Sequence, residues 1–325
     1  MLHIIMYHYV RNNEEFEYNC FSRRKSEFEN QIEYFSKKST IVNPLEFDQI
    51  KFYLERNDEN GFLLTFDDGY KDHLYCAEYL ISKNLSAIFF PPINIVKKEL
   101  LDVNSIHYLI GKKDINLEKL LEFVVEKIKS KNLKIYSNNK ELTIEEYLKQ
   151  KFEDRYGSKN NLLLIKKLLQ RDIVDISMRK KILEEAILYF SGKDSKSLCD
   201  ELYLTLEEMI FMKKKGMLFG SHGLTHQWLE RLSYKEQYKE INESFNELIN
   251  IKVIDANLPK VFCYPYGSYN NLTLEIIKKL DINFCVTSKV GPALILKNKS
   301  LLELNRWNTN DCWDSYWNKP ILPYE

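Results

Sequence analysis

The chain of 325 residues carries 47 Lys and Arg against 47 Asp and Glu, so its formal net charge is zero. That balance argues against a nucleic-acid-binding protein, which normally needs a basic surplus, and against a polybasic membrane-surface binder. Hydrophobic residues make up 44% of the chain and charged residues 29%, which is enough apolar surface to bury a core and excludes intrinsic disorder.

The amino-terminal residues are typical of a strand and lack the basic start and small-residue cleavage site of a signal peptide. No stretch approaches the ~18 apolar residues of a membrane span. The six cysteines are scattered without a C-x-x-C pair, which fits reduced thiols better than a disulfide framework or a structural zinc site. We therefore expect a cytoplasmic protein with no transmembrane segment and no nucleic-acid partner.

The first part of the chain alternates strands and helices. The run 62–66 is apolar enough for a strand buried on both faces, as parallel sheets require, and it ends abruptly in Asp67-Asp68-Gly69. Apolar runs predict strands, and apolar residues at helical spacing predict helices. The predicted strands of this part are 4–10, 62–66 and 87–90, and the predicted helices begin near Ser26 and cover 46–56 and 71–83.

From residue 96 to residue 202 the composition changes. This stretch is rich in Lys, Glu, Leu and Ile, has no proline, and shows apolar residues at helical spacing. It predicts a helical insertion of four to six helices with one short hairpin. Two functional interpretations remain open, because such an insertion either caps a site or serves only as a packing appendage.

After the insertion the alternation of strands and helices resumes. The segments 1–95 and 203–325 together predict an α/β fold, a parallel (β/α) barrel that is distorted or incomplete, with 96–202 as its large helical insertion. A doubly wound parallel sheet is the alternative. The predicted helices here are 206–215, 234–251 and 272–280, and the predicted strands are 217–221, 261–264, 284–288 and 301–306.

Polar residues gather at or just after the carboxyl ends of predicted strands, where catalytic groups lie in parallel α/β folds. Asp67 and Asp68 are costly at the end of an apolar strand unless they are paired or hold a metal, although an Asp-rich turn that caps a helix is the alternative. His222 and His226 are four residues apart and, with an aspartate, form an open metal site of the hydrolytic kind. The residues of this pattern are His8, Asp67, Asp68, His222, His226, Tyr266 and Arg306.

These motifs resemble those of the NodB-like polysaccharide deacetylases, metal-dependent hydrolases of N-acetyl groups on sugars. Residues 64–70, L-T-F-D-D-G-Y, match that family's T-F-D-D-G motif, and residues 220–226, G-S-H-G-L-T-H, look like its H-[ST]-x-x-H motif. Residues 262–267, F-C-Y-P-Y-G, are similar to its R-x-P-Y-G motif. Residues 6–10, M-Y-H-Y-V, resemble the M-Y-H start of a subgroup that includes poly-N-acetylglucosamine deacetylases. The helical insertion lies outside the resemblance.

The resemblance implies a role for each matching residue. Asp68, His222 and His226 would bind one divalent metal, zinc in the first place, with nickel, cobalt or iron as alternatives. Asp67 would be the general base that deprotonates the attacking water. The main-chain N–H of Tyr266 would stabilise the tetrahedral oxyanion of the reaction.

The chain also departs from the family pattern in three places. The arginine that orients the base in the family aligns with Cys263, and Arg306 is the candidate to replace it. The Ser or Thr after the first metal-binding histidine is Gly223, so one supporting hydrogen bond is expected to be missing. Most members carry their general-acid histidine near the carboxyl end, whereas this chain has none after His226. In the M-Y-H subgroup that role passes to the amino-terminal histidine, here His8.

The sequence therefore predicts a cytoplasmic, metal-dependent deacetylase that acts on an amino sugar or a glycan intermediate in surface-polysaccharide biosynthesis. Its substrate would be an N-acetylated sugar, a sugar nucleotide or a glycan. Two alternatives remain open: a hydrolase of another small amide or ester, and a non-catalytic carbohydrate-binding protein on the same fold. Of the other histidines, His3 is expected to be structural and His73 to be exposed in the first turn of its helix.

Overall fold

The computed structural model describes residues 1–12, 18, 22–56, 58–137, 140–153, 161–293, 295 and 301–309. The chain divides into two compact units, one of residues 1–12, 21–98 and 200–325 and one of residues 13–20 and 99–199. Among the described helices, none combines the length and the apolar character that crossing a membrane requires.

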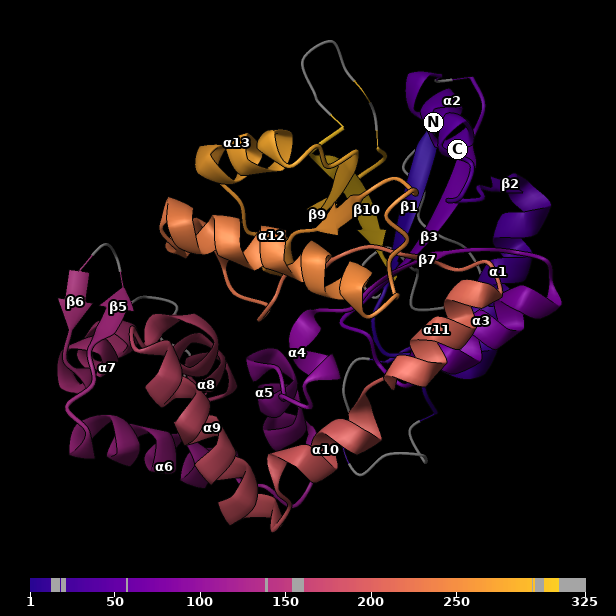
Figure 1. Cartoon of the computed structure of the whole chain (residues 1–325). Coiled ribbons are helices and arrows are strands. Elements are labelled where there is room, and N and C mark those ends of the chain that lie inside the picture. The colour runs from indigo at the N-terminus through magenta and orange to yellow at the C-terminus, as the bar shows by residue number, and fades with distance from the viewer. Residues whose placement is uncertain are drawn as a thin grey trace. The chain divides into compact units, whose positions relative to one another are not determined.

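The larger unit is built on an eight-stranded sheet whose strand pairs are all parallel (Figure 1). Beyond the last strand at one end, Ser221 forms a parallel bridge with Phe262 at the other end, so the sheet nearly closes. The predicted parallel α/β barrel with incomplete closure is thereby confirmed. The strand order is β7 (Leu218–Phe219), β4 (Ile88–Phe90), β3 (Gly61–Asp67), β1 (Leu2–Tyr7), β10 (Leu304–Asn308), β9 (Phe284–Val290) and β8 (Val261–Cys263), and β2 (Thr40–Ile41) pairs with β3.

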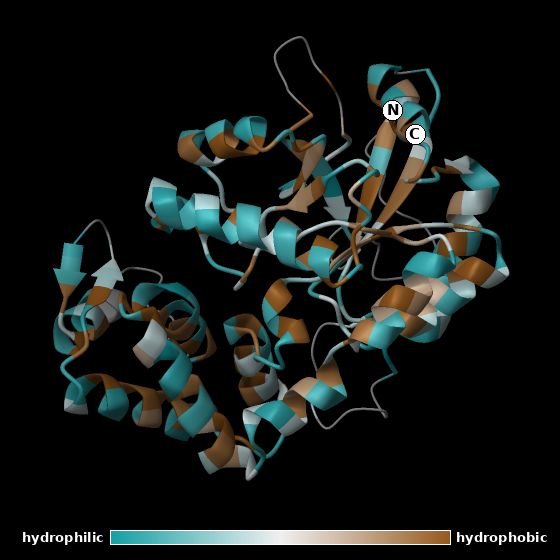
Figure 2. Cartoon of the chain, viewed as in Figure 1, coloured by the Kyte–Doolittle hydropathy of each residue, from teal (hydrophilic) through white to brown (hydrophobic). Residues whose placement is uncertain are grey.

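Both faces of the central strands are buried, as their apolar sequence predicts. β1 and β3 are largely brown in Figure 2, and every residue of both strands is buried. Because successive side chains of a strand point to opposite faces, Leu63, Thr65 and Asp67 share one face of β3. Leu63 belongs to the core cluster within the barrel. The apolar core therefore leads directly to the polar residues at the carboxyl end of the sheet.

Amphipathic helices accompany the strands of this unit. Helix α12 (Tyr234–Asn250) begins at Ser233, whose hydroxyl accepts a hydrogen bond from the N–H of Glu236. Its visible face in Figure 2 is mostly hydrophilic, whereas Ile241 and Leu248 are buried. The other helices of this unit are α1 (Lys25–Lys38), α2 (Phe47–Glu55), α3 (Asp72–Ser82), α4 (Ile93–Val96), α11 (Leu206–Lys214) and α13 (Asn271–Lys279).

Two expectations about single residues are wrong. The strand predicted at 301–306 is Leu304–Asn308, so Arg306 lies inside β10 rather than at its end, next to a register irregularity between Leu304 and Arg306. His73 is fully buried, not exposed. Helix α3 packs its first turn against the sheet, and the His73 ring meets Phe66 edge-on at 5.3 Å.

The smaller unit is mainly helical and contains one antiparallel hairpin, β5 (Ile135–Ser137) with β6 (Lys140–Leu142). A buried ion pair joins Arg179 to Asp102 within it, with Nε 3.0 Å from Oδ2. Its role as a cap or as a packing appendage stays a prediction. The helices between residues 96 and 202 are α5 (Asp102–Gly111), α6 (Leu117–Ser130), α7 (Ile144–Glu153), α8 (Asn161–Lys167), α9 (Ile176–Ser191) and α10 (Ser195–Leu202).

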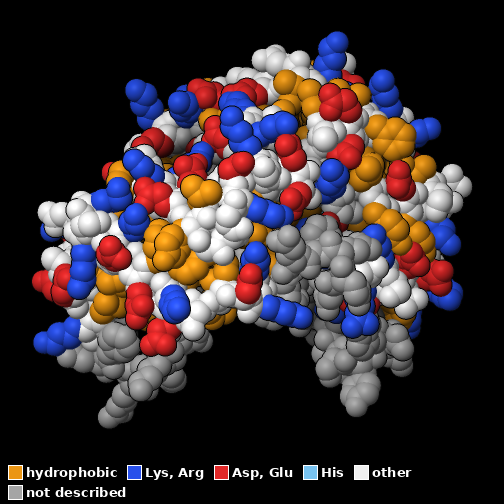
Figure 3. Space-filling view, turned by 90° about the horizontal axis from the view of Figure 1, so that it is seen from below, with side chains coloured by type: hydrophobic (Ala, Val, Ile, Leu, Met, Phe, Trp, Pro, Cys, Tyr) orange, Lys and Arg blue, Asp and Glu red, His pale blue; other side chains and the backbone are white. Residues whose placement is uncertain are grey.

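The balanced charge of the chain is visible on its surface. On the face shown in Figure 3, the described Lys and Arg side chains are interspersed with Asp and Glu side chains. This intermixing agrees with a formal net charge of zero.

Candidate metal centre and active site

Two neighbouring carboxylates leave the end of β3 toward the same site. Asp67 is the last residue of the strand, and Asp68 and Gly69 follow with left-handed φ angles of 73° and 68°. The left-handed backbone at Gly69 favours glycine, and any side chain there would also have to displace the end of the Ile95 side chain. Asp67 and Asp68 are 2% and 4% exposed. The sharp turn is what brings both carboxylates together instead of to opposite faces of the strand.

The two histidines of the second motif face one oxygen of Asp68. The Nε2 atoms of His222 and His226 lie 3.4 Å and 3.3 Å from Oδ1 of Asp68. The loop between them curls back because Gly223 and His226 have φ angles of 81° and 57°. The three ligand-type atoms lie within 4.8 Å of one another. Two ligands about 2.1 Å from a tetrahedral ion are about 3.4 Å apart, so this spacing fits one cation.

The chemistry of these atoms also fits a cation. The Nδ1 atom of His222 lies 2.8 Å from the carbonyl oxygen of Cys263, and we assign Nδ1–H as the donor, which leaves Nε2 toward Asp68 to carry either a proton or a metal. Among the described residues, the buried Oδ1 of Asp68 has no hydrogen-bond partner, whereas Oδ2 accepts from the Tyr70 hydroxyl at 2.6 Å. A buried carboxylate oxygen that faces two imidazole nitrogens is satisfied by a positive charge between them, from a proton or a metal.

The directions in which the pKa values of these three residues shift agree with that requirement. Burial acts to raise the pKa of Asp68, yet the two histidines hold it well below its ordinary value. Burial acts to lower the pKa of His222, but Cys263 and Asp68 raise it well above its ordinary value. Burial lowers the pKa of His226 despite the nearby carboxylate. The carboxylate of Asp68 is thus ionised, and it favours a positive charge beside the Nε2 atom of His222, whether from a proton or from a metal, whereas burial keeps the His226 ring neutral.

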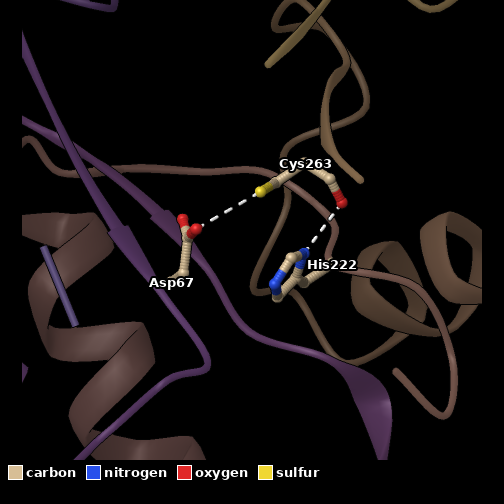
Figure 4. Close-up of side chains that lie close together, drawn as sticks. All are labelled: Asp67, His222 and Cys263. Atoms are coloured by element: carbon tan, nitrogen blue, oxygen red, sulfur yellow. Dashed lines mark hydrogen bonds between the residues drawn. The ribbon is translucent and has the colours of Figure 1, made fainter. Parts of the chain in front are cut away.

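A second set of ligand-type atoms, from Asp67, His222 and Cys263, is joined by hydrogen bonds instead (Figure 4). Cys263 lies between the other two, with its Sγ 3.5 Å from Oδ2 of Asp67 and its carbonyl oxygen toward the His222 ring. Burial raises the pKa of the Cys263 thiol, so the group is protonated at neutral pH. Asp68, His222 and His226 are therefore the group that could hold a metal.

Arg306 forms a buried bidentate ion pair with Asp67. Its Nη1 and Nη2 atoms donate to Oδ1 and Oδ2 of Asp67 at 2.8 Å and 2.7 Å. Its Nε donates to the carbonyl oxygen of Thr287 at 2.8 Å, and Nη1 also approaches Oγ1 of Thr65 at 3.2 Å. Burial alone would raise the pKa of Asp67, but Arg306, helped by two nearby histidines, lowers it to about 2. Asp67 is therefore ionised at neutral pH. Its cationic partner is Arg306 on β10 and not a side chain at position 263.

His8 is placed next to Asp67 by strand register. β1 and β3 pair Tyr7 with Phe66, so the residues that follow, His8 and Asp67, lie level. The Nε2 atom of His8 is 3.9 Å from Oδ2 of Asp67, too far for a hydrogen bond. The His8 side chain is 31% exposed, whereas that of Asp67 is 3% exposed. His8 thus borders the site from its solvent side.

Tyr266 lies in the turn Pro265–Gly267 with a φ angle of 57°. Its ring meets the His226 ring edge-on at 4.5 Å and stacks on Trp228 at 4.5 Å with an interplanar angle of 8°. Trp228 was not singled out by the sequence, because a lone aromatic after a histidine motif has no distinctive spacing. The pair places an apolar aromatic surface beside His226 of the candidate metal group, and such a surface suits the faces of sugar rings.

Supporting residues of the histidine loop were also missed by the sequence analysis. Glu240 of α12 accepts hydrogen bonds from the N–H groups of Leu224 and Thr225, at 3.1 Å and 2.9 Å, and from the Thr225 hydroxyl at 2.6 Å. The Ser221 hydroxyl accepts from the N–H of Gly223 at 3.1 Å, so this part of the loop has support from the residue before the first histidine. One signal was available, because Glu240 falls on the buried face of its helix, where a charge needs partners.

A model of the family described as polysaccharide deacetylase matches residues 173–285. The match includes His222, His226 and Tyr266, whereas Asp67 and Asp68 lie outside it. No curated protein matches the sequence.

Solved structures share the fold across most of the chain. A deacetylase from Streptococcus pyogenes, PplD, solved with acetate, is 19% identical with a TM-score of 0.55 and 94% of this chain and 91% of that one covered. IcaB from Ammonifex degensii is 13% identical with a TM-score of 0.54 and the same two coverages, 94% and 91%. A de-N-acetylase from Aggregatibacter actinomycetemcomitans is 12% identical with a TM-score of 0.51 and 97% of each chain covered. The resemblance to polysaccharide deacetylases is thus confirmed by the family model over residues 173–285, and the solved structures share the fold.

Proposed function

We propose that this chain is a metal-dependent enzyme of the polysaccharide deacetylase family that hydrolyses the N-acetyl group of an amino sugar or glycan intermediate. We place the reaction in the cytoplasm and in surface-polysaccharide biosynthesis, with an N-acetylated sugar, sugar nucleotide or glycan as substrate. The observation that carries the proposal is the buried group of Asp68, His222 and His226 directly beside the ionised Asp67.

Asp68, His222 and His226 would hold the cation. Two imidazoles and one carboxylate favour zinc, with nickel, cobalt or iron as alternatives. When bound, such an ion acidifies water and polarises the amide carbonyl. The lone buried oxygen of Asp68, which lacks a hydrogen-bond partner among the described residues, supports this assignment.

Asp67 is the group that takes the proton of the attacking water. Arg306 occupies one lone-pair position on each carboxylate oxygen, and a carboxylate has about four such positions, so Asp67 retains acceptor capacity. A carboxylate whose pKa is about 2 is a weak base. Proton transfer to Asp67 therefore depends on a water that the site has made acidic.

His8 and Tyr266 serve the later part of the reaction. When the C–N bond breaks, its electron pair goes to nitrogen, and an amine departs poorly unless that nitrogen receives a proton. His8 borders the site from the solvent side, 3.9 Å from Asp67, and is the proposed donor. The main-chain N–H of Tyr266 is the proposed donor to the oxyanion that forms on the acetyl carbonyl.

The same substitution at two adjacent positions tests the assignment. Asp67→Asn should keep the metal and lose acetate release by roughly 100-fold or more, because it removes the proton acceptor. Asp68→Asn should lose the metal, because it removes a ligand. Elemental analysis and acetate release from N-acetylated sugars measure both effects. Substantial acetate release by Asp67→Asn, or full metal content in Asp68→Asn, would contradict the proposal.

A non-catalytic carbohydrate-binding protein is the second candidate suggested by the sequence, because the base-orienting arginine is absent at Cys263. The bidentate contact of Arg306 with Asp67 supplies a cation to that carboxylate and so favours the enzyme. Hydrolysis of another small amide or ester would use the same groups, and acetate release from non-sugar amides and esters distinguishes it.

A further inference from the structure

The segment that carries His8 is fastened to the first turn of α3 by two consecutive side chains. The Nε2 atom of His73 lies 2.9 Å from the carbonyl oxygen of His8. Next to it, Oδ2 of Asp72 accepts from the N–H of Val10 at 3.2 Å and from Nε of Arg11 at 2.7 Å. The chain on the carboxyl side of the His8 side chain is therefore held from one helix end.

His73 is suited to hold that carbonyl oxygen. The residue is fully buried, with its ring edge-on to Phe66 at 5.3 Å and to Tyr70 at 5.5 Å. Burial lowers the pKa of His73 to about 4, so the ring is neutral at pH 7. A neutral ring has one N–H, and because a carbonyl oxygen only accepts, that N–H is at Nε2.

The same segment is linked to the candidate metal centre. The ring of Tyr9 stacks on that of Tyr70 with centroids 4.0 Å apart, and the Tyr70 hydroxyl donates to Asp68 at 2.6 Å. Helix α3 follows directly after the Asp67-Asp68 turn. If the His8 segment moved while Asp67 and Asp68 stayed in place, the distance between His8 and Asp67 would therefore change.

We propose that His73 is a positioning residue for the general acid: by holding the His8 carbonyl oxygen, with Asp72 holding Val10 and Arg11, it sets the separation of His8 and Asp67. This inference rests on the proposed deacetylase function. The two groups are 3.9 Å apart, too far to bond each other but close enough for both to contact one substrate atom at about 2.8 Å. A leaving nitrogen there would receive its proton from His8 while Asp67 holds the proton taken from water.

The experiment compares two substrates, because the need for a general acid depends on the leaving group. The full-length, metal-loaded chain is assayed on an N-acetylated sugar, whose amine must be protonated, and on 4-nitrophenyl acetate, whose phenolate leaves without a proton. His73→Phe keeps an aromatic ring but loses the donor. We expect kcat on the sugar to fall roughly 10- to 100-fold with little change in KM, since small misplacements of catalytic groups cost that much. The ester rate should change less than about threefold.

A second variant and a readout independent of activity accompany this test. His73→Gln retains a side-chain N–H donor and should recover most of the sugar rate. Hydrogen exchange at the main-chain amides of residues 8–11 should quicken in His73→Phe and remain near wild type in His73→Gln. His3→Phe is the matched control, because His3 is also buried on β1 but bonds Asn60 and Trp307 near the other end of the strand. It should keep the wild-type ratio of sugar to ester rates.

His8→Ala separates failure of this inference from failure of the proposed function. If His8→Ala lowers the sugar rate far more than the ester rate and His73→Phe does not, the positioning role is overturned while the acid role stands. If His8→Ala lowers both rates equally, the acid role of His8 fails and the positioning role fails with it. Selective loss on the sugar in both variants, with recovery in His73→Gln, supports the inference.

Discussion

A single guanidinium determines the charge of the candidate base. Asp67 is buried, and an unpaired buried carboxylate costs several kcal/mol, so the ion would not persist there alone. Two nearly parallel hydrogen bonds from Arg306, at 2.8 Å and 2.7 Å, offset that cost and fix the orientation of the carboxylate. The planar fork of arginine is what allows both contacts at once, and lysine offers only a point charge.

Arg306→Lys should therefore lower kcat by at least about tenfold and raise the pKa of Asp67 from about 2 toward its ordinary range. Because Asp67 must be ionised to accept a proton, activity would then be lost at a higher pH on the acid side. A pH profile of acetate release measures the shift. Arg179→Lys is the matched control, since Arg179 also forms a buried pair, with Asp102 at 3.0 Å. An unchanged acid limb in Arg306→Lys would contradict this role.

His73 makes the stability of the fold depend on pH. Its pKa is about 4 in the folded chain against an ordinary 6.5, so between these values the unfolded chain binds more protons. The free energy of unfolding therefore falls as pH falls through this window, by on the order of 2–3 kcal/mol from this residue. Urea unfolding at pH 7 and pH 4.5 should show a smaller decrease for His73→Gln than for wild type. Equal decreases would contradict the buried, neutral state of His73.

Site residues whose partners are close in sequence could be predicted from the sequence. Contacts between residues that are distant in sequence could not. The sequence identified two pairs of site residues, because each pair lies within one motif after a strand: Asp67 with Asp68, and His222 with His226. The contact of Arg306 with Asp67 joins residues 239 positions apart, and the sequence supplied only a candidate for it. The burial of His73 was missed because its position in the helix does not say which side of that helix meets the sheet.

At the scale of elements, α12 both covers the barrel and holds the histidine loop. Its buried face carries Gln237, Glu240 and Ser244 as well as apolar residues. Burial raises the pKa of Glu240 despite three hydrogen bonds from the loop. A strict helical pattern predicted the helix correctly, but it treats every buried position as core. The polar members of that face are the ones that support the site.

Glu240→Gln should weaken metal binding roughly 10- to 100-fold, because it disturbs the hydrogen bonds that orient the loop between His222 and His226. Competition with a chelator measures the metal affinity. Glu247→Gln on the same helix is the control, since Glu247 forms an ion pair with Lys97 between side chains that are 36% and 45% exposed. Equal metal affinity in Glu240→Gln and wild type would show that the loop does not need this support.

β10 shows why element boundaries were harder to predict than element types. The sequence predicts a strand at 301–306, but pairing with β1 and β9 sets its bounds at Leu304–Asn308. The register irregularity next to Arg306 arises from those neighbours and has no signature in the local sequence. The long arginine side chain nevertheless reaches Asp67 from inside the strand.

At the scale of the whole molecule, the parallel barrel follows from alternating strands and helices, and the order of its strands follows from pairing between distant segments. β1 lies between β3 and β10, which come from opposite parts of the chain (Figure 1). This arrangement brings His8, Asp67 and Arg306 to one end of the barrel. Hydrophobic pattern predicted the fold class, whereas near-closure through Ser221 and Phe262 depends on tertiary contacts alone.

The central claim is that Asp67 and the Asp68, His222 and His226 group make this chain a metal-dependent deacetylase. Its most direct test is acetate release from a panel of N-acetylated sugar nucleotides and oligosaccharides, before and after removal of metal. We expect equal amounts of acetate and free amine from at least one member of the panel, loss of this activity with a chelator, and recovery with zinc, nickel, cobalt or iron. Tight sugar binding without acetate release, in protein that holds its metal, would contradict the claim.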